Sequence, residues 1–375
     1  MSDSHSEILD NILLSMIEGI GSRTYQRLLE RFGNVTEILN ASYRDLNDFE
    51  FLKSDTALRL ASARQNFDPN IIFELCQRNQ IDIISIQDSQ YPEPLRTIHD
   101  PPPILYVKGK ILPQDTFSIA VIGTRRSSAY GCRQANRLVT ALAHNGFTII
   151  SGLALGIDGI AHRAALKANA RTLAILGSGH HRIYPPEHET LAEQIIQSGG
   201  AVLSEYPPLH QSSKWTFPQR NRIVSGLSLG VLVVESPLRS GAMISARIAG
   251  EQGRDIFSVP GSIESPTSQG CHQLIRDGAY LVESIDDILN VLGPLRQKVL
   301  LFDKPQFPDP IRHPNEISLN EIELIVLRSI GMIPTPLHNI VTTTGLEEQQ
   351  VVAALSVLEK KRIIRQISPI VFVKM

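Results

Sequence analysis

Seven short runs of apolar residues, separated by segments with helical spacing, constrain the fold of this 375-residue chain more than any other feature. The runs lie at residues 118–123, 147–152, 171–177, 201–205, 229–236, 255–261 and 279–284. They lack the alternation of apolar and polar residues, which is typical of strands covered on both faces. Strands that alternate with helices form a parallel sheet through right-handed crossovers. The sequence therefore predicts an α/β fold built on a doubly wound, mostly parallel sheet.

The composition is that of a globular protein and argues against several other classes. Hydrophobic residues make up 42% of the chain and charged residues 20%, and a chain of this length is expected to form two or three domains. Cys76, Cys132 and Cys271 form no C-x-x-C pair, so we expect reduced thiols in a cytoplasmic protein and no metal site. No signal peptide is recognisable, and no run approaches about 18 apolar residues, so we expect no membrane insertion.

Changes of pattern along the chain predict four segments, at residues 1–80, 81–293, 294–316 and 317–375. The first is helical, and the Gly19-Ile20-Gly21 turn resembles a helix-hairpin-helix, whose backbone N–H groups can hold a DNA phosphate; the alternative is a bundle in which these glycines only form a turn. The second begins with a strand and a proline-rich connector that reaches residue 109, and then carries the sheet. A proline-rich linker follows. Three helices and a strand pair at the end predict a winged helix.

The loops at the carboxyl ends of the predicted parallel strands are glycine-rich, and ligands of such sheets bind at this edge. In the first loop Arg125 replaces the second glycine of a dinucleotide fingerprint, and its guanidinium offers a planar fork for a phosphodiester. The alternative is that Arg125 pairs with a nearby carboxylate. In the later loops Asp158 is expected to cap a helix, and His180 and His181 are expected to be exposed.

A basic stretch follows, with six lysines and arginines against two glutamates between Lys214 and Arg254, in a chain of net charge −2. Lys214 followed by Phe217 suits a phosphate contact beside a base-stacking surface, although burial of Phe217 in a core is an equal alternative. Ser240-Gly241 opens a helix whose free N–H groups favour an anion. The stretch therefore predicts a phosphate-binding edge.

Motifs of common enzyme classes are missing from the sequence. It contains no H-E-x-x-H or Walker motif, and only Glu205 and Glu235 are plausible catalytic carboxylates, for which we expect structural roles. We therefore predict a protein without catalytic activity or cofactor. Two alternatives stay open. One is a nucleotide phosphoribohydrolase of the lonely-guy type, which the missing carboxylate between Gly241 and Glu251 disfavours; the other is a dinucleotide-binding oxidoreductase, which the missing G-x-G-x-x-G disfavours.

Several long motifs, in order, resemble those of the DNA-processing protein A family, also called Smf or DprA. They are GTRRxxxYG, SGLALGID, SEYP, FPQRNRIVSGLS and VVESPLRSGAMISARIAGEQGRDIFSVPG, and the resemblance covers residues 91–287. It implies an extended Rossmann-like domain, flanked by an N-terminal all-α domain (SAM or helix-hairpin-helix-like) and a C-terminal winged helix. It further implies a non-catalytic homodimer that binds single-stranded DNA, protects incoming DNA during natural transformation and loads RecA recombinase onto it. Single-strand binding protein is a further candidate partner.

The resemblance assigns DNA contact to Arg125, Lys214 and Asn221, places Phe217 in a base pocket, and adds the Ser240-Gly241 turn with Ser245. The family more often has threonine at the last of these positions, but serine keeps the hydroxyl. Together with the glycine-rich loops and the neighbouring arginines, the predicted DNA-binding set is Gly123, Arg125, Arg126, Ser151, Gly152, Gly156, Gly177, Ser178, Gly179, Lys214, Phe217, Arg220, Asn221, Arg222, Ser240, Gly241 and Ser245.

The predicted winged helix fits DNA less well than the basic stretch does. Recognition helices read DNA with their N-terminal residues, but this one begins with Glu347 and Glu348, whose carboxylates repel phosphates. The basic residues 360–362 lie at its far end. We therefore predict that this segment binds duplex DNA weakly or contacts a protein.

Overall fold

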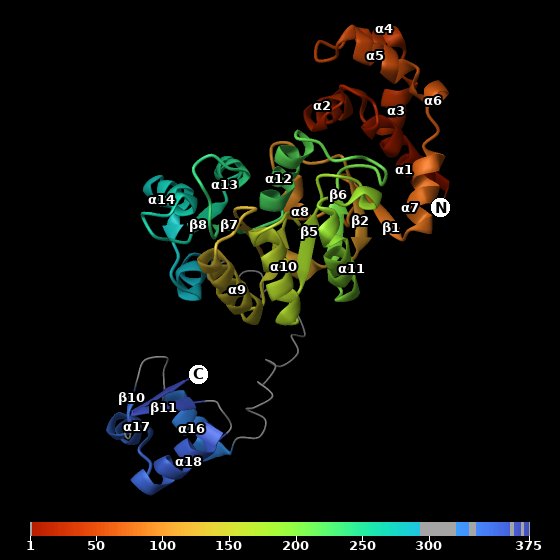
Figure 1. Cartoon of the computed structure of the whole chain (residues 1–375). Coiled ribbons are helices and arrows are strands. Elements are labelled where there is room, and N and C mark those ends of the chain that lie inside the picture. Colours follow the sequence, from red (N-terminus) through yellow and green to blue (C-terminus); the bar gives the residue numbers. More distant parts are fainter. Residues whose placement is uncertain (1, 293–319, 330–334, 361–363, 369–370, 375) are drawn as a thin grey trace. The chain divides into compact units, whose positions relative to one another are not determined.

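The structure is a computed structural model that describes residues 2–292, 320–329, 335–360, 364–368 and 371–374 (Figure 1). It divides into two compact units, residues 1–304 and 305–375, which are described separately. The linker predicted at residues 294–316 lies outside the described residues, and the other predicted domain borders stay predictions.

Helices fill the N-terminal part of the first unit, as the sequence periodicity predicts. They are α1 (Ser2–Ser15), α2 (Ser22–Phe32), α3 (Val35–Asn40), α4 (Tyr43–Asn47), α5 (Ser54–Ala61), α6 (Ala63–Asn66) and α7 (Asn70–Arg78). A core around Leu14, Tyr25 and Leu28 holds α1 to α6 together, and the Tyr25 hydroxyl donates a hydrogen bond to Asn11 Oδ1 at 2.5 Å. These helices therefore have a core of their own.

The glycine turn between α1 and α2 is built for close packing. Gly19 has a φ of +99°, and a Cβ atom there would lie 2.5 Å from the Thr56 side-chain oxygen. Glycine is required for both reasons, since other residues rarely adopt this backbone conformation. The packing explains Gly19 without a ligand, and a phosphate-binding role for this turn stays a prediction.

A nine-stranded sheet forms the centre of the first unit. Its strands are β1 (Ile81–Ser85), β2 (Ile104–Gly109), β3 (Ser118–Ile122), β4 (Thr148–Ser151), β5 (Thr172–Ile175), β6 (Ala201–Ser204), β7 (Gly230–Val233), β8 (Asp255–Ser258) and β9 (Tyr280–Leu281). Their order is β1-β2-β6-β5-β4-β3-β7-β8-β9; β1 and β2 are antiparallel to their neighbours and all other pairs are parallel. Each of the seven apolar runs contains one of the parallel strands.

The proline-rich connector was only partly predicted. Residues 104–109, which the sequence suggested to be connecting chain, form β2, which pairs with both β1 and β6. The prolines at 101–103 precede this strand and favour extended backbone without occupying it. Strands β1 and β2 thus form an antiparallel edge of the sheet.

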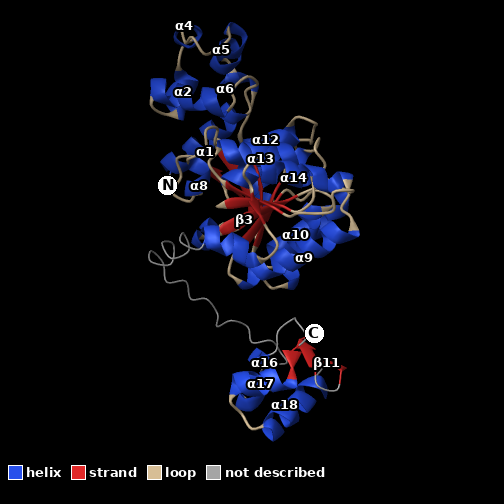
Figure 2. Ribbon diagram, turned by 90° about the vertical axis from the view of Figure 1, so that its left-hand side faces the viewer, coloured by secondary structure: helices blue, strands red, loops and turns tan. Residues whose placement is uncertain are grey.

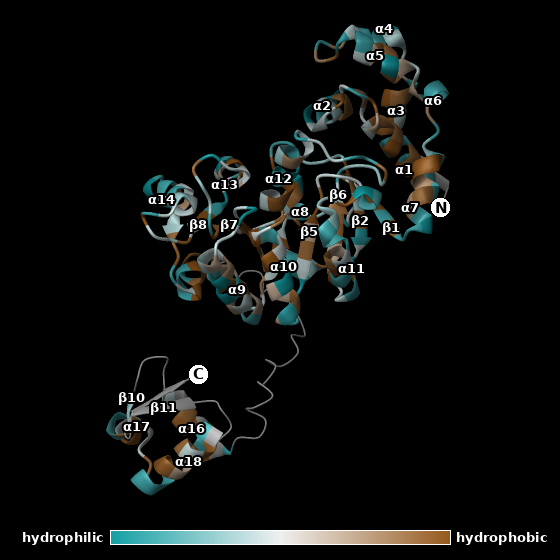
Figure 3. Ribbon diagram, viewed as in Figure 1, coloured by the Kyte–Doolittle hydropathy of each residue, from teal (hydrophilic) through white to brown (hydrophobic). Residues whose placement is uncertain are grey.

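Helices cover both faces of the sheet (Figure 2). They are α8 (Glu93–Arg96), α9 (Ala129–His144), α10 (Ile157–Lys167), α11 (Glu189–Gln197), α12 (Thr216–Gly226), α13 (Gly241–Glu251) and α14 (Gln269–Arg276), with 3₁₀ turns at Pro113–Thr116, His180–Arg182, Pro186–His188 and Pro266–Ser268. In β3, Ile119 and Val121 pack toward α9 and α10, whereas Ala120 and Ile122 pack toward α12 and α13. This double burial explains the continuous apolar runs, which Figure 3 shows as hydrophobic central strands. The predicted α/β, Rossmann-like fold is confirmed.

The second unit contains helices and a small antiparallel sheet. Its elements are α16 (Glu321–Ser329), β10 (Thr335–Pro336), α17 (Leu337–Thr344), α18 (Glu348–Lys360), β11 (Ile364–Ser368) and β12 (Val371–Lys374), with strand order β10-β12-β11. Val326, Ile340 and Leu355 lie in its core. Across the described parts of both units, no helix has the length and apolar character of a membrane span, and no group of side chains could hold a metal ion.

Candidate nucleic-acid interface

The loops after β3 and β4 meet at the carboxyl edge of the sheet, which we call the rim. The backbone N–H of Ile157 donates to the Thr124 carbonyl at 3.2 Å. Gly156 has a φ of +76°, and a Cβ atom there would lie 2.2 Å from the same carbonyl oxygen. Only glycine permits this approach. Gly156, predicted as a DNA contact, thus fixes the loop that carries Arg125.

Arg220 corrects one prediction, because its guanidinium lies inside the protein and not on the surface. The residue is 4% exposed, and its Nη1 donates to the carbonyls of Gly152 and Ile175, at the ends of β4 and β5. Burial lowers the pKa of Arg220 to about 10. Gly152 has no room for a Cβ atom beside this guanidinium. Arg220 therefore joins two rim loops to helix α12 and is not a surface phosphate ligand.

Asp158 stabilises the same junction. Its carboxylate accepts hydrogen bonds from the backbone N–H groups of Gly152 at 3.2 Å and Ala154 at 3.4 Å, so it binds the preceding loop and not the N-terminus of its own helix. Burial raises the pKa of Asp158, and the positive charge of Arg220 opposes this shift. The predicted helix-capping role was wrong, although the structural role was right.

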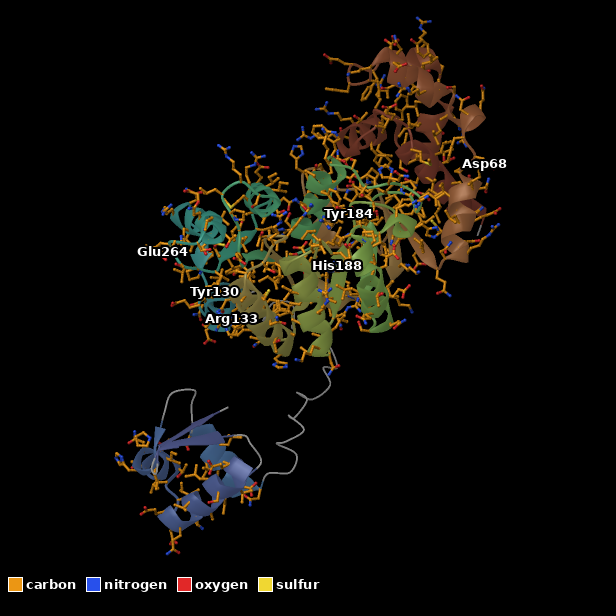
Figure 4. The ribbon with its side chains drawn as sticks, in the orientation of Figure 1. Asp68, Tyr130, Arg133, Tyr184, His188 and Glu264 are labelled. Carbon is orange, nitrogen blue, oxygen red and sulfur yellow. The ribbon has the colours of Figure 1, made fainter. Side chains whose placement is uncertain are left out.

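Arg125 lies on the rim beside two aromatic rings. Its guanidinium carbon is 5.3 Å from the centre of the Phe217 ring, and the Tyr184 ring is 5.5 Å from Phe217. Arg125 is exposed, and among the described residues it forms no ion pair with a carboxylate, which was the alternative prediction. Phe217 is half-buried against Gly177, and Tyr184, labelled in Figure 4, is 47% exposed. A cation and two accessible rings thus share one surface.

Lys214 and Trp215 extend this surface at the start of α12. Both side chains are exposed, and the Lys214 ammonium lies 5.1 Å from the centre of the Trp215 ring. Trp215 is 69% exposed, which is unusual for so large an apolar side chain. Lys214 forms no ion pair within the described part of the chain. The sequence prediction missed Trp215, although an aromatic residue directly beside the proposed phosphate-binding lysine was a usable signal.

Arg222 corrects a second prediction. It is buried and forms ion pairs with Glu205 at 2.5 Å and with Asp100 at 3.1 Å. Two carboxylates already neutralise its charge, so it is not a free phosphate ligand. The same contacts give Glu205 the structural role that was expected. Glu235 is also engaged, since it accepts hydrogen bonds from the Ser128 N–H at 2.9 Å and from the Thr267 hydroxyl.

At the turn before α13, the side-chain hydroxyls form hydrogen bonds with nearby backbone groups. The Ser240 hydroxyl caps the helix by accepting from the Met243 N–H at 3.3 Å, and the buried Ser245 hydroxyl donates to the Gly241 carbonyl at 3.1 Å. Gly241 is exposed. Asn221 is half-buried, and its side-chain oxygen accepts a hydrogen bond from Arg220 Nε at 3.3 Å. These residues shape the rim more than they line its surface.

Several of the small rim residues are buried within the loops and act on the backbone. In the loops after β4 and β5 the buried members of the predicted set are Ser151, Gly152, Gly177, Ser178 and Gly179, whereas in the loop after β3 Gly123 is half-buried and Arg126 is exposed. The Ser151 hydroxyl donates to the Val121 carbonyl at 2.6 Å. The expectation that both histidines of the third loop are exposed holds only for His181, because His180 is buried with Nε2 3.0 Å from the Val202 carbonyl.

Comparisons with known proteins found relatives in both sequence and structure. The family model of DNA recombination-mediator protein A matches residues 82–293. The protein Smf of Synechocystis is 34% identical over 372 residues, which cover 92% of this chain and 93% of that protein. The X-ray structure of DNA processing protein A from Streptococcus pneumoniae has a TM-score of 0.65 and 35% identity, over 75% of this chain and 95% of that one. A structure of DNA processing protein A from Helicobacter pylori, described for its single-stranded DNA binding mode, has a TM-score of 0.52 and 33% identity, over 57% of this chain and 96% of that one.

Proposed function

The chain belongs to the DNA recombination-mediator protein A family, and from this premise we propose that it binds single-stranded DNA along the rim. It does so without catalysis, protects DNA that enters the cell during natural transformation, and delivers that DNA to RecA recombinase. Membership in the family and the single-stranded DNA binding mode described for the Helicobacter pylori relative support the choice of ligand.

The observation that carries the proposal is the contrast between the rim cations. The guanidinium groups of Arg220 and Arg222 are bound by acceptors of the protein itself. Arg125 and Lys214 are exposed, and their charged groups lie 5.3 Å and 5.1 Å from the centre of an aromatic ring. Exposed cations beside accessible rings are the combination that binds single strands, because the cations attract phosphates and the rings stack on bases regardless of sequence. Duplex DNA, with its bases paired and stacked, cannot use the rings.

The proposed lack of catalysis rests on the state of the two rim carboxylates. Glu205 is paired with Arg222, and Glu235 accepts two hydrogen bonds from protein donors. A general base must reach the proton that it abstracts, and both carboxylates are committed to structural partners. Incubation with AMP tests this part, since release of free adenine would contradict it and favour the phosphoribohydrolase alternative.

The partners form the less direct part of the proposal. We assign to this chain a homodimer, RecA as the recipient of the DNA, and single-strand binding protein as a further partner, all on the family resemblance. The second unit is assigned a winged helix. Its helix α18 starts with Glu348 in the first turn, which supports a protein contact or weak duplex binding. A truncation of residues 294–375 tests this, and a more than tenfold loss of single-strand affinity would contradict it.

The central test is fluorescence anisotropy with a labelled oligonucleotide, single-stranded against duplex, over a salt series. In Arg125→Ala and Lys214→Ala we expect weaker single-strand binding and a slope of log K against log salt that is smaller by about 0.7 for each phosphate that the variant no longer neutralises. Lys167→Ala is the matched control, because this exposed lysine ends helix α10, away from the rim. Binding that is unchanged in both rim variants would place the site elsewhere.

A further inference from the structure

Helix α2 carries a row of three arginines that folding does not explain. Arg23, Arg27 and Arg31 are four residues apart, so they lie along one face of the helix, and all three are exposed. Like charges at this spacing repel and destabilise a helix. Within the described part of the chain, none of the three forms an ion pair. The row therefore has a cost in stability that a ligand would offset.

The charge of the surrounding segment makes the row specific. Residues 1–80 contain eight lysines and arginines against twelve aspartates and glutamates, so the segment as a whole is acidic. Three of its eight basic residues nevertheless lie on one face of α2, where Glu30 is the single acidic residue of the helix. Because the segment as a whole is acidic, its basic face cannot be explained by a general tendency of the segment to bind polyanions. It is a defined surface with the charge that phosphates complement.

An exposed aromatic ring belongs to the same surface. The Arg27 guanidinium carbon lies 3.6 Å from the centre of the Phe51 ring, in the loop between α4 and α5. Phe51 is 51% exposed, and the Phe49 ring packs edge-on against it at 5.5 Å. The stack holds the guanidinium in place and leaves part of the ring open. Arginine with an accessible ring repeats the chemistry of Arg125 and Phe217 on the rim.

A direct contact connects this helix with the rim. Arg222 of α12 donates a hydrogen bond through Nη2 to the Ser22 hydroxyl at 3.3 Å, and Ser22 opens α2. Figure 1 shows α2 beside the upper part of α12. The exposed Lys214 and Trp215 precede that same helix. The first turn of α2 therefore lies beside α12, the helix that Lys214 and Trp215 precede.

We propose that the α2 surface (Arg23, Arg27, Arg31 and Phe51) is a second contact for single-stranded DNA, which binds the part of a strand that extends beyond the rim. The inference rests on the proposed function, since the rim must bind the strand first. It gives the N-terminal helices a role in DNA binding that depends on the length of the strand. Short strands occupy the rim alone, and longer strands reach both surfaces.

The test compares oligonucleotides of about 6 and about 30 nucleotides, because one single-strand site covers roughly 4–16 nucleotides, so the first fills little more than a small site and the second exceeds a large one. The triple variant replaces Arg23, Arg27 and Arg31 with glutamine, which keeps helix propensity. With the long strand we expect a salt slope smaller by about 2 and, near 0.1 M salt, a Kd higher by on the order of 100-fold, at about 0.7 in slope for each neutralised phosphate. With the short strand the variant should bind as the parent does.

A control variant removes the same number of exposed arginines from elsewhere in the helical segment. These are Arg44, Arg59 and Arg78, each also replaced by glutamine. It should bind both strands as the parent does. In a second variant, Phe51→Ala, all charges remain, so a loss of affinity restricted to the long strand, with an unchanged salt slope, supports stacking on this ring.

The outcomes separate the inference from the proposed function. A parent that binds neither strand contradicts both. A parent that binds the two strands equally well, or an α2 variant that matches the parent on the long strand, overturns the inference and leaves rim binding intact. Weakening of duplex binding alone also overturns it, because the surface would then serve duplex DNA. Equal weakening on short and long strands overturns it as well, since α2 would not be a separate contact.

Discussion

Replacement of Trp215 by alanine is expected to weaken single-strand binding without affecting the fold. The ring is 69% exposed and lies next to the Lys214 ammonium, at 5.1 Å from its centre. Stacking of a base on an aromatic ring contributes about 1–3 kcal/mol by alanine substitution, so Kd should rise about 5- to 150-fold. Because so little of the ring is buried, the free energy of unfolding should change by no more than about 0.5 kcal/mol.

The chain itself provides the assay. Trp215 is its only tryptophan, so the intrinsic fluorescence of the parent reports on this one ring. Titration with an unlabelled oligonucleotide should change the emission in parallel with binding. Anisotropy of a labelled strand then gives Kd for the parent, for Trp215→Ala and for Trp215→Phe, which keeps a ring and should bind within a few-fold of the parent.

The salt dependence of binding distinguishes stacking from an electrostatic effect. The Trp215→Ala variant loses no charge, so its slope of log K against log salt should equal that of the parent. A Kd that does not change in Trp215→Ala would refute the reasoning. So would emission that stays constant while anisotropy reports binding, or a phenylalanine variant as weak as the alanine variant.

Three further predictions concern stability. Arg220→Met leaves two buried carbonyl acceptors unpaired, at about 1–3 kcal/mol each, so thermal unfolding should shift to clearly lower temperature; an unchanged Tm would contradict the bonding described. Gly156→Ala should cost about 1–3 kcal/mol in a denaturant titration, because φ is +76° and the Thr124 carbonyl blocks the new Cβ atom; a neutral effect would contradict the backbone geometry. Burial lowers the pKa of His162 to about 3 and of His180 to about 4, below the value of about 6.5 in the unfolded chain. The unfolded state therefore binds more protons between these values, and stability should fall as pH falls from about 6.5 toward 4; urea titrations at several pH values, in which substitution of either histidine by glutamine flattens the dependence, check this.

The parallel sheet was predictable because its signal is local. Six of the seven apolar runs hold strands with few polar residues that are mostly buried, because both faces of the sheet are covered there; the exception is β9, whose Tyr280 and Leu281 are exposed. The antiparallel strand β2 was less evident, because the prolines before it suggested connecting chain. The pattern of apolar residues predicts which segments are buried. It predicts which strands pair only where pairing goes together with burial.

The site could be predicted in its location but not in the role of each residue. The local charge count placed Lys214, Arg220 and Arg222 together, and the first glycine loop added Arg125, yet neither signal can tell which guanidinium points inward. That choice depends on acceptors that are far away in the sequence, such as the Ile175 carbonyl for Arg220. The small rim residues were predicted because the loops at the strand ends are glycine-rich, and the structure shows that many of them shape the backbone of these loops.

The most direct test of the account is ultraviolet cross-linking of a single-stranded oligonucleotide to the parent protein, followed by mass spectrometry of the cross-linked peptides. Aromatic rings that stack on bases should form the cross-links, so we expect attachment at Trp215, Tyr184 or Phe217. Cross-links should disappear in excess unlabelled single strand and persist in excess duplex. Attachment confined to residues 320–374, with none on the rim, would contradict the central claim.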